Sequence, residues 1–200
     1  MAKQLTNEQI LKNQEITMKL VNKFPTGRRE QVIDMLGGKV GEVYFTAPAS
    51  SKEEFHACYT GGLCQHSLNL VLNLKKLSDA LCPGKYNQAT LSFVGLFHDL
   101  GKVGDGVHEY YIPNPSDWHR NKGMLYEINK KCVYMPTSER GLYILQKYEI
   151  KLSDEEYLAI RLNDGQYDDT NKNYKMKEPE LALLVHWADM WSCKQEKSED

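Results

Sequence analysis

Apolar residues that recur at helical spacing constrain this chain more than any other feature of its sequence. One run is bounded by Gly61-Gly62 and Pro83-Gly84, and its apolar positions are Leu63, Leu70, Leu74 and Leu77. Spacings of three, four and seven residues bring side chains to one face of an α-helix, whereas a strand would alternate at every second residue. Glycine and proline interrupt a helix at both ends of the run. The pattern therefore predicts an amphipathic helix with one buried face.

The same periodicity recurs along much of the chain. Further helices are predicted over residues 5–24, 28–36, 88–100, 138–148, 153–163 and 179–193. Gly101 is the predicted C-terminal cap of the helix before it, and Ser153 to Glu156 resembles a capping box. Val43 to Phe45 is predicted as a short strand, 165–177 as a polar loop, and 194–200 as a charged, frayed tail.

An irregular segment separates the predicted helices. Residues 104–136 are rich in Gly, Pro, Tyr, Asn and Asp, which predicts an insertion that could hold a short hairpin. A chain of 200 residues is long enough to bury one sizeable core. The fold class is therefore predicted as all-α, in one domain over 1–200, with helices within residues 1–40 packing on the rest.

Composition excludes several classes of function. The formal net charge is −2, so no overall positive field favours long nucleic acids. No apolar run approaches the length of a membrane span, and the N-terminus lacks an apolar signal region. The five cysteines are Cys58, Cys64, Cys82, Cys132 and Cys193, without a C-x-x-C motif. We therefore expect a cytoplasmic protein with reduced thiols, and neither a disulfide framework nor a zinc–thiolate site.

Polar residues with metal-binding side chains interrupt three of the predicted apolar faces. His66 falls on the stripe of leucines, His98 and Asp99 end an apolar run, and Asp189 lies within LVHWADMW. Each histidine alone would be an ordinary core histidine, but a carboxylate is rarely buried unless it is paired or bound to metal. Imidazole and carboxylate suit manganese, iron, nickel, cobalt or zinc. The four residues together predict a site for one divalent transition-metal ion.

The adjacent pair His98-Asp99 has its own geometric requirement. Neighbours on a helix point about 100° apart, so both can reach one ion only if it lies beyond the last helical turn. Lys102 follows Asp99 by three residues. It could reach a phosphate as a point charge, or it could be an ordinary cation at a helix C-terminus.

In these motifs the chain resembles the HD-domain superfamily of metal-dependent phosphohydrolases, whose signature reads H…HD…D. The matching residues are His66, His98-Asp99 and Asp189. The segments FHACYTGGLCQHSLNL, FVGLFHDLGK and LALLVHWADMW resemble those that carry the three motifs, and YILQKYEIKLSDEEYLAIRLNDGQYD resembles a stretch of one bacterial branch. The resemblance covers about residues 45–193. It implies a helical bundle, a metal held by those four side chains, and hydrolysis of phosphate esters.

The resemblance also bears on the number of ions. Some branches bind a second metal through extra histidines, and this chain has Thr137 and Asn163 near where those fall in the branch compared. The departure predicts a single ion. His108 and His119, in the insertion, are the residues that could compensate.

The resemblance and the residue types together predict individual roles. Asp99 would orient or deprotonate the attacking water, and Lys102 would neutralise charge that develops on the phosphate. His56 could donate to the phosphate or the leaving group, or it could be a supporting loop histidine. His186, one helical turn before Asp189, is predicted to support the ligands and not to bind the ion.

The expected substrate is a small phosphorylated molecule, most simply a nucleotide or deoxynucleotide. Aromatic and cationic residues alternate in the insertion at Tyr110, Tyr111, Trp118, His119, Arg120, Lys122 and Tyr126. They could stack a base and hold phosphates, with His119 and Arg120 as substrate-binding residues, or they could pack a lid. A phosphodiesterase or exonuclease for cyclic nucleotides or nucleic-acid ends, and a non-catalytic nucleotide sensor or adaptor, remain alternatives. A homo-oligomer is also left open.

Overall fold

The computed structural model describes residues 4–198, and its regular structure is mostly helical, which confirms the predicted all-α class. The α-helices are α1 (Asn7–Val21), α2 (Thr26–Gly37), α3 (Lys39–Thr46), α4 (Gly62–Leu81), α5 (Gln88–Phe97), α6 (Asp117–Arg120), α7 (Thr137–Lys147), α8 (Asp154–Arg161) and α9 (Glu180–Ser198). The 3-10 helices are η1 (Leu100–Val103), η2 (Gly165–Tyr167) and η3 (Asp169–Tyr174). Strands β1 (Tyr111–Pro113) and β2 (Tyr126–Ile128) pair antiparallel within the insertion, where the sequence predicted that a short hairpin could form.

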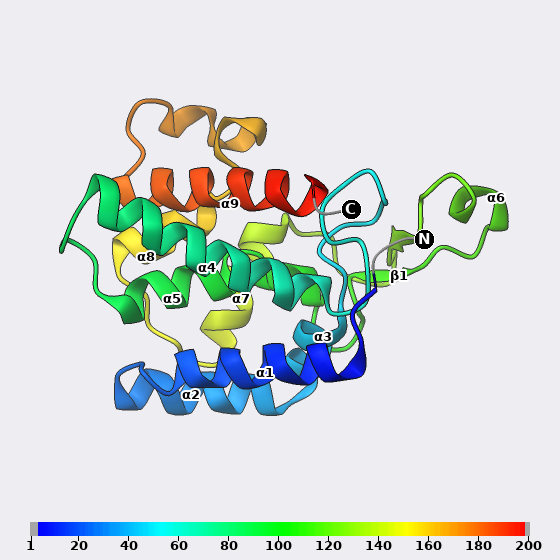
Figure 1. Cartoon of the computed structure of the whole chain (residues 1–200), viewed down its shortest axis with the longest axis horizontal. Helices are drawn as coiled ribbons and strands as arrows, with labels where there is room; N and C mark the ends of the chain where they lie inside the picture. The colour runs from blue at the N-terminus through cyan, green and yellow to red at the C-terminus, as the bar shows by residue number, and fades with distance from the viewer. Residues whose placement is uncertain (1–3, 199–200) are drawn as a thin grey trace.

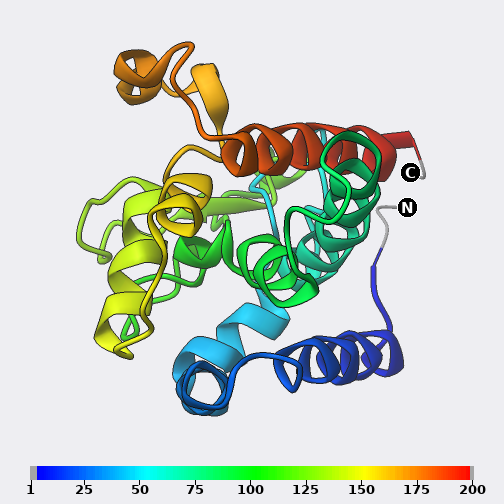
Figure 2. The same ribbon diagram turned by 90° about the vertical axis from the view of Figure 1, so that its left-hand side faces the viewer.

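Helix α4 is the centre of the arrangement. It packs against α9 and against α5, while α1 lies across both α4 and α5, with α2 beside it on the same side of the molecule (Figures 1 and 2). The end of α5, η1 and the start of α7 come together beside α8. Helices α5 and α9, which are far apart in the sequence, thus both pack along α4.

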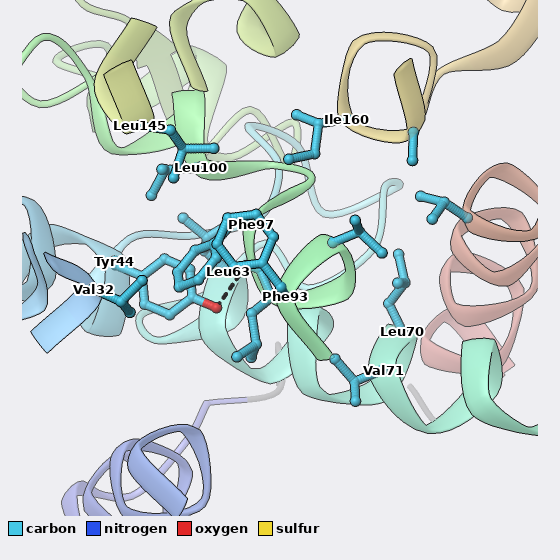
Figure 3. Close-up of a cluster of buried hydrophobic side chains, with 14 of the residues drawn as sticks. Val32, Tyr44, Leu63, Leu70, Val71, Phe93, Phe97, Leu100, Leu145 and Ile160 are labelled. Carbon is cyan, nitrogen blue, oxygen red and sulfur yellow. Dashed lines mark hydrogen bonds between the residues drawn. The ribbon is translucent and has the colours of Figure 1, made fainter. Parts of the chain in front are cut away.

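The hydrophobic core connects all of these layers. Phe93, Phe97 and Leu63 are fully buried at its middle, and Tyr44 donates a hydrogen bond of 2.9 Å to the Leu96 carbonyl (Figure 3). Each fully buried side chain of this size contributes roughly 1.5–3 kcal/mol relative to an exposed one. Residues of α1 and α2, including Val21, Phe24, Val32 and Met35, belong to the same buried cluster.

The predicted strand at Val43 to Phe45 is wrong, because these residues lie in α3. Val40, Val43 and Tyr44 are buried there at spacings of three and four residues. That spacing is helical, and a window of three apolar residues was too short to show it.

The C-terminal prediction also needs correction. Residues 194–198 continue α9 and do not fray, and only 199–200 of the predicted tail lie outside the described residues. Glu196 is only 3% exposed. The helix continues because this part of it packs on α4 through polar contacts, such as those of Glu196 with His66 and Asn69. The charged sequence of this segment does not predict them.

Two smaller expectations change as well. The predicted loop at 165–177 contains η2 and η3. Gly101 does not cap a helix; it lies inside η1, where a Cβ atom would be 1.9 Å from the carbonyl oxygen of Thr137. The glycine is required because η1 and α7 approach too closely for any side chain.

The insertion extends away from the helical body, with α6 at its tip (Figure 1). Among the residues that the structure describes, none of the helices combines the length and the apolar character that a membrane span requires.

Candidate metal centre

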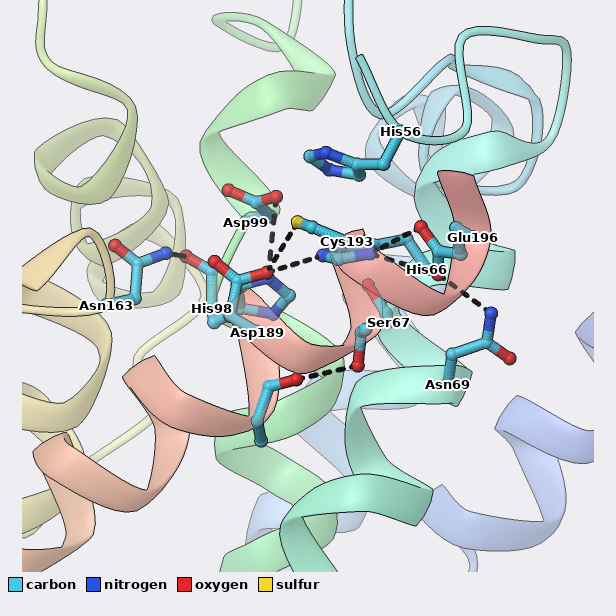
Figure 4. A network of polar contacts seen from close by, with 12 residues as sticks. His56, His66, Ser67, Asn69, His98, Asp99, Asn163, Asp189, Cys193 and Glu196 are labelled. Atoms are coloured by element: carbon cyan, nitrogen blue, oxygen red, sulfur yellow. Dashed lines mark hydrogen bonds and ion pairs between the residues drawn. The ribbon is translucent and has the colours of Figure 1, made fainter. Parts of the chain in front are cut away.

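The four side chains predicted as metal ligands converge where α4, α9 and the end of α5 meet (Figure 4). His66 Nε2 lies 2.9 Å from Asp189 Oδ1, and His98 Nε2 lies 4.0 Å from the same oxygen. One ligand atom from each of these three residues lies within 4.8 Å of the other two. Asp99 Oδ2 lies beside this group, 3.4 Å from His98 Nε2. Residues separated by more than a hundred positions therefore share one polar site.

The hydrogen bonds of the Nδ1 atoms show which tautomer His66 and His98 adopt when neutral. His98 Nδ1 is 2.9 Å from the carbonyl oxygen of Gly95, which can only accept, so Nδ1 carries the proton. His66 Nδ1 faces the Glu196 carboxylate at 3.0 Å and 3.2 Å, and it donates for the same reason. In a neutral ring this leaves a lone pair on Nε2. Both Nε2 lone pairs then point into the same space as the carboxylates.

The Nε2 atoms of His66 and His98 are buried and lack hydrogen-bond partners. His66 and His98 are 0% exposed, and neither Nε2 atom has a hydrogen bond of acceptable geometry with any described residue. Asp189 Oδ1 lies 2.9 Å from His66 Nε2, and this contact becomes an ion pair only when the ring is protonated. Buried polar atoms without partners are rare and costly. Facing lone pairs and carboxylates are satisfied together by a cation, so the donor set fits a divalent ion.

The electrostatics of the site show the same demand for positive charge. Burial would lower the pKa of His66, but the carboxylates of Asp189 and Glu196 outweigh it and raise that pKa to about 10, so without a metal ion the ring itself takes up the positive charge as a proton. A metal ion at Nε2 would replace that proton. Burial would likewise raise the pKa of Asp99, but the Lys102 ammonium and the His98 ring hold it well below its usual range. Lys102 Nζ lies 2.6 Å from Asp99 Oδ2, and this carboxylate raises the pKa of the lysine despite its burial.

Glu196 is a residue of the site that sequence reasoning missed. Besides accepting from His66, its Oε1 accepts a 2.8 Å hydrogen bond from Asn69. Asn69 Oδ1 accepts from Gln65 at 3.0 Å, and Gln65 Oε1 accepts from Asn13 of α1 at 3.0 Å. Each amide donates toward the carboxylate, so the chain of bonds fixes Glu196 and, through it, the His66 ring. The seven-residue spacing from Asp189 was the available signal, since it places both residues on one face.

We expect Glu196→Ala to weaken the affinity for divalent metal by roughly 10- to 100-fold, the usual effect of losing the partner that orients a ligating histidine. Competition with a chromophoric chelator measures it. Glu196→Gln, which keeps an acceptor for His66 Nδ1–H, should recover most of the affinity. Glu42→Ala, at an exposed carboxylate paired with Lys39, is the control. Wild-type affinity in the Glu196→Ala protein would contradict the positioning role.

His56 and Cys193 line the same space from the other side. A Cβ at Gly62 would lie 2.1 Å from the Ala57 carbonyl oxygen, so the glycine lets residues 56–57 pack against the start of α4. The ring of His56 then lies 4.4 Å from that of His66, centre to centre, and burial together with nearby cations lowers the pKa of His56 to about 2. Cys193 Sγ lies 3.5 Å from Asp189 Oδ1. His56, His66 and Cys193 form a second group whose ligand atoms lie within 4.8 Å of one another. The sequence prediction did not include this thiol, although it lies one helical turn after Asp189.

His186 and Asn163 support the site from behind. His186 Nδ1 donates a 2.8 Å hydrogen bond to the Asn163 carbonyl, and Asn163 Nδ2 donates to the His98 carbonyl at 3.2 Å. His186 thus contacts the backbone of Asn163, whose side chain in turn contacts the backbone of His98, and its supporting role stays a prediction. Asn163, one of the two positions compared with a second metal's histidines, directs its amide nitrogen at this backbone.

Within the predicted set of aromatic and cationic residues of the insertion, Tyr111 lies near the site, whereas His119 and Arg120 do not. Tyr111 of β1 lies near Lys102, whose charge lowers the pKa of this tyrosine, but burial outweighs that effect and raises the pKa to about 12. His119 and Arg120 lie on α6 at the far end of the insertion (Figure 1). Arg120 bonds to the Asn114 carbonyl and to Asp117, and His108 pairs with Asp105 at 3.2 Å. The substrate contacts of His119 and Arg120 stay predictions.

No disulfide joins the five cysteines in the described residues. Comparisons of the chain with protein-family models, with curated proteins and with solved structures find no match.

Proposed function

We propose that this protein is a metal-dependent phosphohydrolase of the HD-domain superfamily, and that it hydrolyses a phosphate ester of a nucleotide or deoxynucleotide. The observation that carries the proposal is the pair of buried imidazoles whose Nε2 lone pairs face two carboxylates. A buried arrangement of acceptors is unfavourable without a cation. Lys102, paired with Asp99 at the edge of the site, adds a positive charge that a phosphate group can approach.

The residues that would hold the ion are His66, His98, Asp99 and Asp189. A bound divalent transition metal supplies Lewis acidity toward a phosphate oxygen and lowers the pKa of water. Manganese, iron, nickel, cobalt and zinc all suit this donor set. One ion is proposed, because the amide nitrogen of Asn163 is committed to the His98 backbone.

Three side chains beside the proposed ion would orient water and bind the phosphate. Asp99 stays ionised because its pKa is held down, so its carboxylate accepts a hydrogen bond from a water molecule and orients it. Lys102 neutralises charge that develops on the phosphate oxygens. His56 is neutral at pH 7 and can donate one N–H to the phosphate or to the leaving group. Because Tyr111 of the hairpin lies near Lys102, we propose that the substrate enters beside the hairpin of the insertion.

A substrate screen tests the proposal directly. Ribonucleoside and deoxyribonucleoside mono- and triphosphates, with bis-p-nitrophenyl phosphate as a generic phosphodiester, are incubated with the purified protein and added manganese, cobalt or nickel. We expect phosphate release from at least one nucleotide, loss of that activity after chelation, and recovery when the metal is restored. Preference for the phosphodiester would favour the phosphodiesterase alternative. Nucleotide binding without any turnover would contradict an enzyme and favour a sensor.

A further inference from the structure

The outer side of α9 carries an exposed apolar stripe. Its members share one face at spacings of three, four and seven residues: Leu183, Trp187, Met190 and Trp191. Trp187 is 45% exposed, Met190 44% and Trp191 57%. The opposite face of the same helix is buried against α4 and α8. Large apolar side chains that gather on an exposed face mark a surface that binds another molecule more often than a solvated one.

A hollow of about 320 Å³ adjoins this stripe. It lies between η2 and the first half of α9, and residues 165–174 stand beside that half of the helix (Figures 1 and 2). Its walls include Leu162, Tyr167 and Ala182, and it shares Leu183 and Met190 with the stripe. One face thus presents both a hollow and, a turn or two further along α9, two protruding indoles. A surface that carries both features can be complementary to a second copy of itself.

The charged residues at the two ends of the stripe are also complementary to those of a second copy. Glu180 precedes Trp187 by seven residues and Lys194 follows it by seven, so both lie on the face of the stripe. Two α9 helices that cross antiparallel at Trp187 would set Glu180 of each copy opposite Lys194 of the other. The same register sets Leu183, at the hollow, opposite Trp191. Glu180 also pairs with Lys85 at 2.7 Å, but its side chain remains 57% exposed and can accept a second cation.

We propose that this stripe is the interface of a homodimer, in which two copies of the chain pair through α9 about a two-fold axis near Trp187. The observations favour a second copy as the partner. Two-fold symmetry in this register brings the hollow of each copy opposite an indole of the other, and Glu180 of each copy opposite Lys194 of the other. The proposal does not depend on the chemistry of the metal centre. It does place the interface on the helix that carries Asp189, so assembly would brace this ligand from outside.

Sedimentation equilibrium of the full-length chain, from about 1 to 100 μM, tests the proposal. We expect a dimer whose dissociation constant rises by more than about tenfold in Trp187→Arg, because this change sets like charges together at the axis. Trp191→Arg should act in the same direction. Trp118→Arg is the matched control, since Trp118 is 58% exposed on α6, outside the stripe. Thermal unfolding of each variant checks that its fold is retained.

Charge reversal tests the register. Lys194→Glu should weaken the dimer, and the double variant Glu180→Lys with Lys194→Glu should restore it, because the opposite charges then meet again with their positions exchanged. A wild-type chain that stays monomeric at 100 μM would overturn the proposal. So would a dimer that persists unchanged in both tryptophan variants. Failure of the double variant to recover the affinity of the single one would overturn the antiparallel register.

Discussion

His66→Ala and Asp99→Ala proteins are expected to hold less than about a tenth of the divalent metal that the wild-type protein holds, since losing a ligand should cost at least as much as losing a partner of a ligand. His66 supplies one of two Nε2 lone pairs at the site, and Asp99 supplies one of its carboxylates. The measurement is metal content by inductively coupled plasma mass spectrometry after purification and dialysis against weak chelator. Asp99→Asn is a companion variant that keeps the side-chain volume beside Lys102 and reduces the risk of misfolding.

The control for this experiment is His186→Ala. His186 is a histidine on the same helix as Asp189, but its ring bonds to the backbone carbonyl of Asn163 and not to the proposed ligands. It should retain far more metal than His66→Ala does. Undiminished metal content in both His66→Ala and Asp99→Ala, with folded protein confirmed by circular dichroism, would refute the assignment of the site.

Much of the fold could be predicted because helical spacing is a local property of the sequence. The stripe of α4 and the capping box of α8 were visible in the residues themselves, and Ser153 and Glu156 form the expected reciprocal bonds. The strand predicted at Val43 to Phe45 failed because β-branched and aromatic residues also pack well on a short buried helix. Propensity at three positions was outweighed by burial at Val40, Val43 and Tyr44.

The site could be predicted in part for a different reason. Carboxylates and histidines on apolar faces need partners, so His66, His98, Asp99 and Asp189 stand out from their neighbours along the chain. Glu196 does not stand out, because it lies among charged residues near the chain end, where exposure is the ordinary expectation. Its burial depends on His66 and Asn69, which lie 130 and 127 positions earlier in the chain. The seven-residue spacing from Asp189 indicates that Glu196 shares a helix face with it, but the partners of Glu196 follow from how α4 and α9 pack.

We expect Lys102→Met to lower the turnover of the preferred substrate by roughly 10²- to 10³-fold while the metal content stays near that of the wild-type protein. Lys102 follows Asp99 in η1, its side chain is 15% exposed, and its ammonium lies 2.6 Å from Asp99 Oδ2. If its role is to neutralise charge that develops on the phosphate, its loss should lower kcat and kcat/KM together. Steady-state kinetics at saturating metal, with metal content measured on the same samples, separates this role from metal binding.

Two other roles for Lys102 give different results in the same experiment. If the lysine mainly holds Asp99 in place for the ion, metal content should fall along with turnover, and excess metal should restore the rate. If it is an ordinary cation at the end of a helix, turnover should match that of Lys147→Met, which removes an exposed lysine from α7. Either outcome would contradict a direct role on the phosphate. The proposed role is supported only if kcat falls, metal content holds, and added metal does not rescue the rate, because that combination places the missing charge on the substrate side of Asp99.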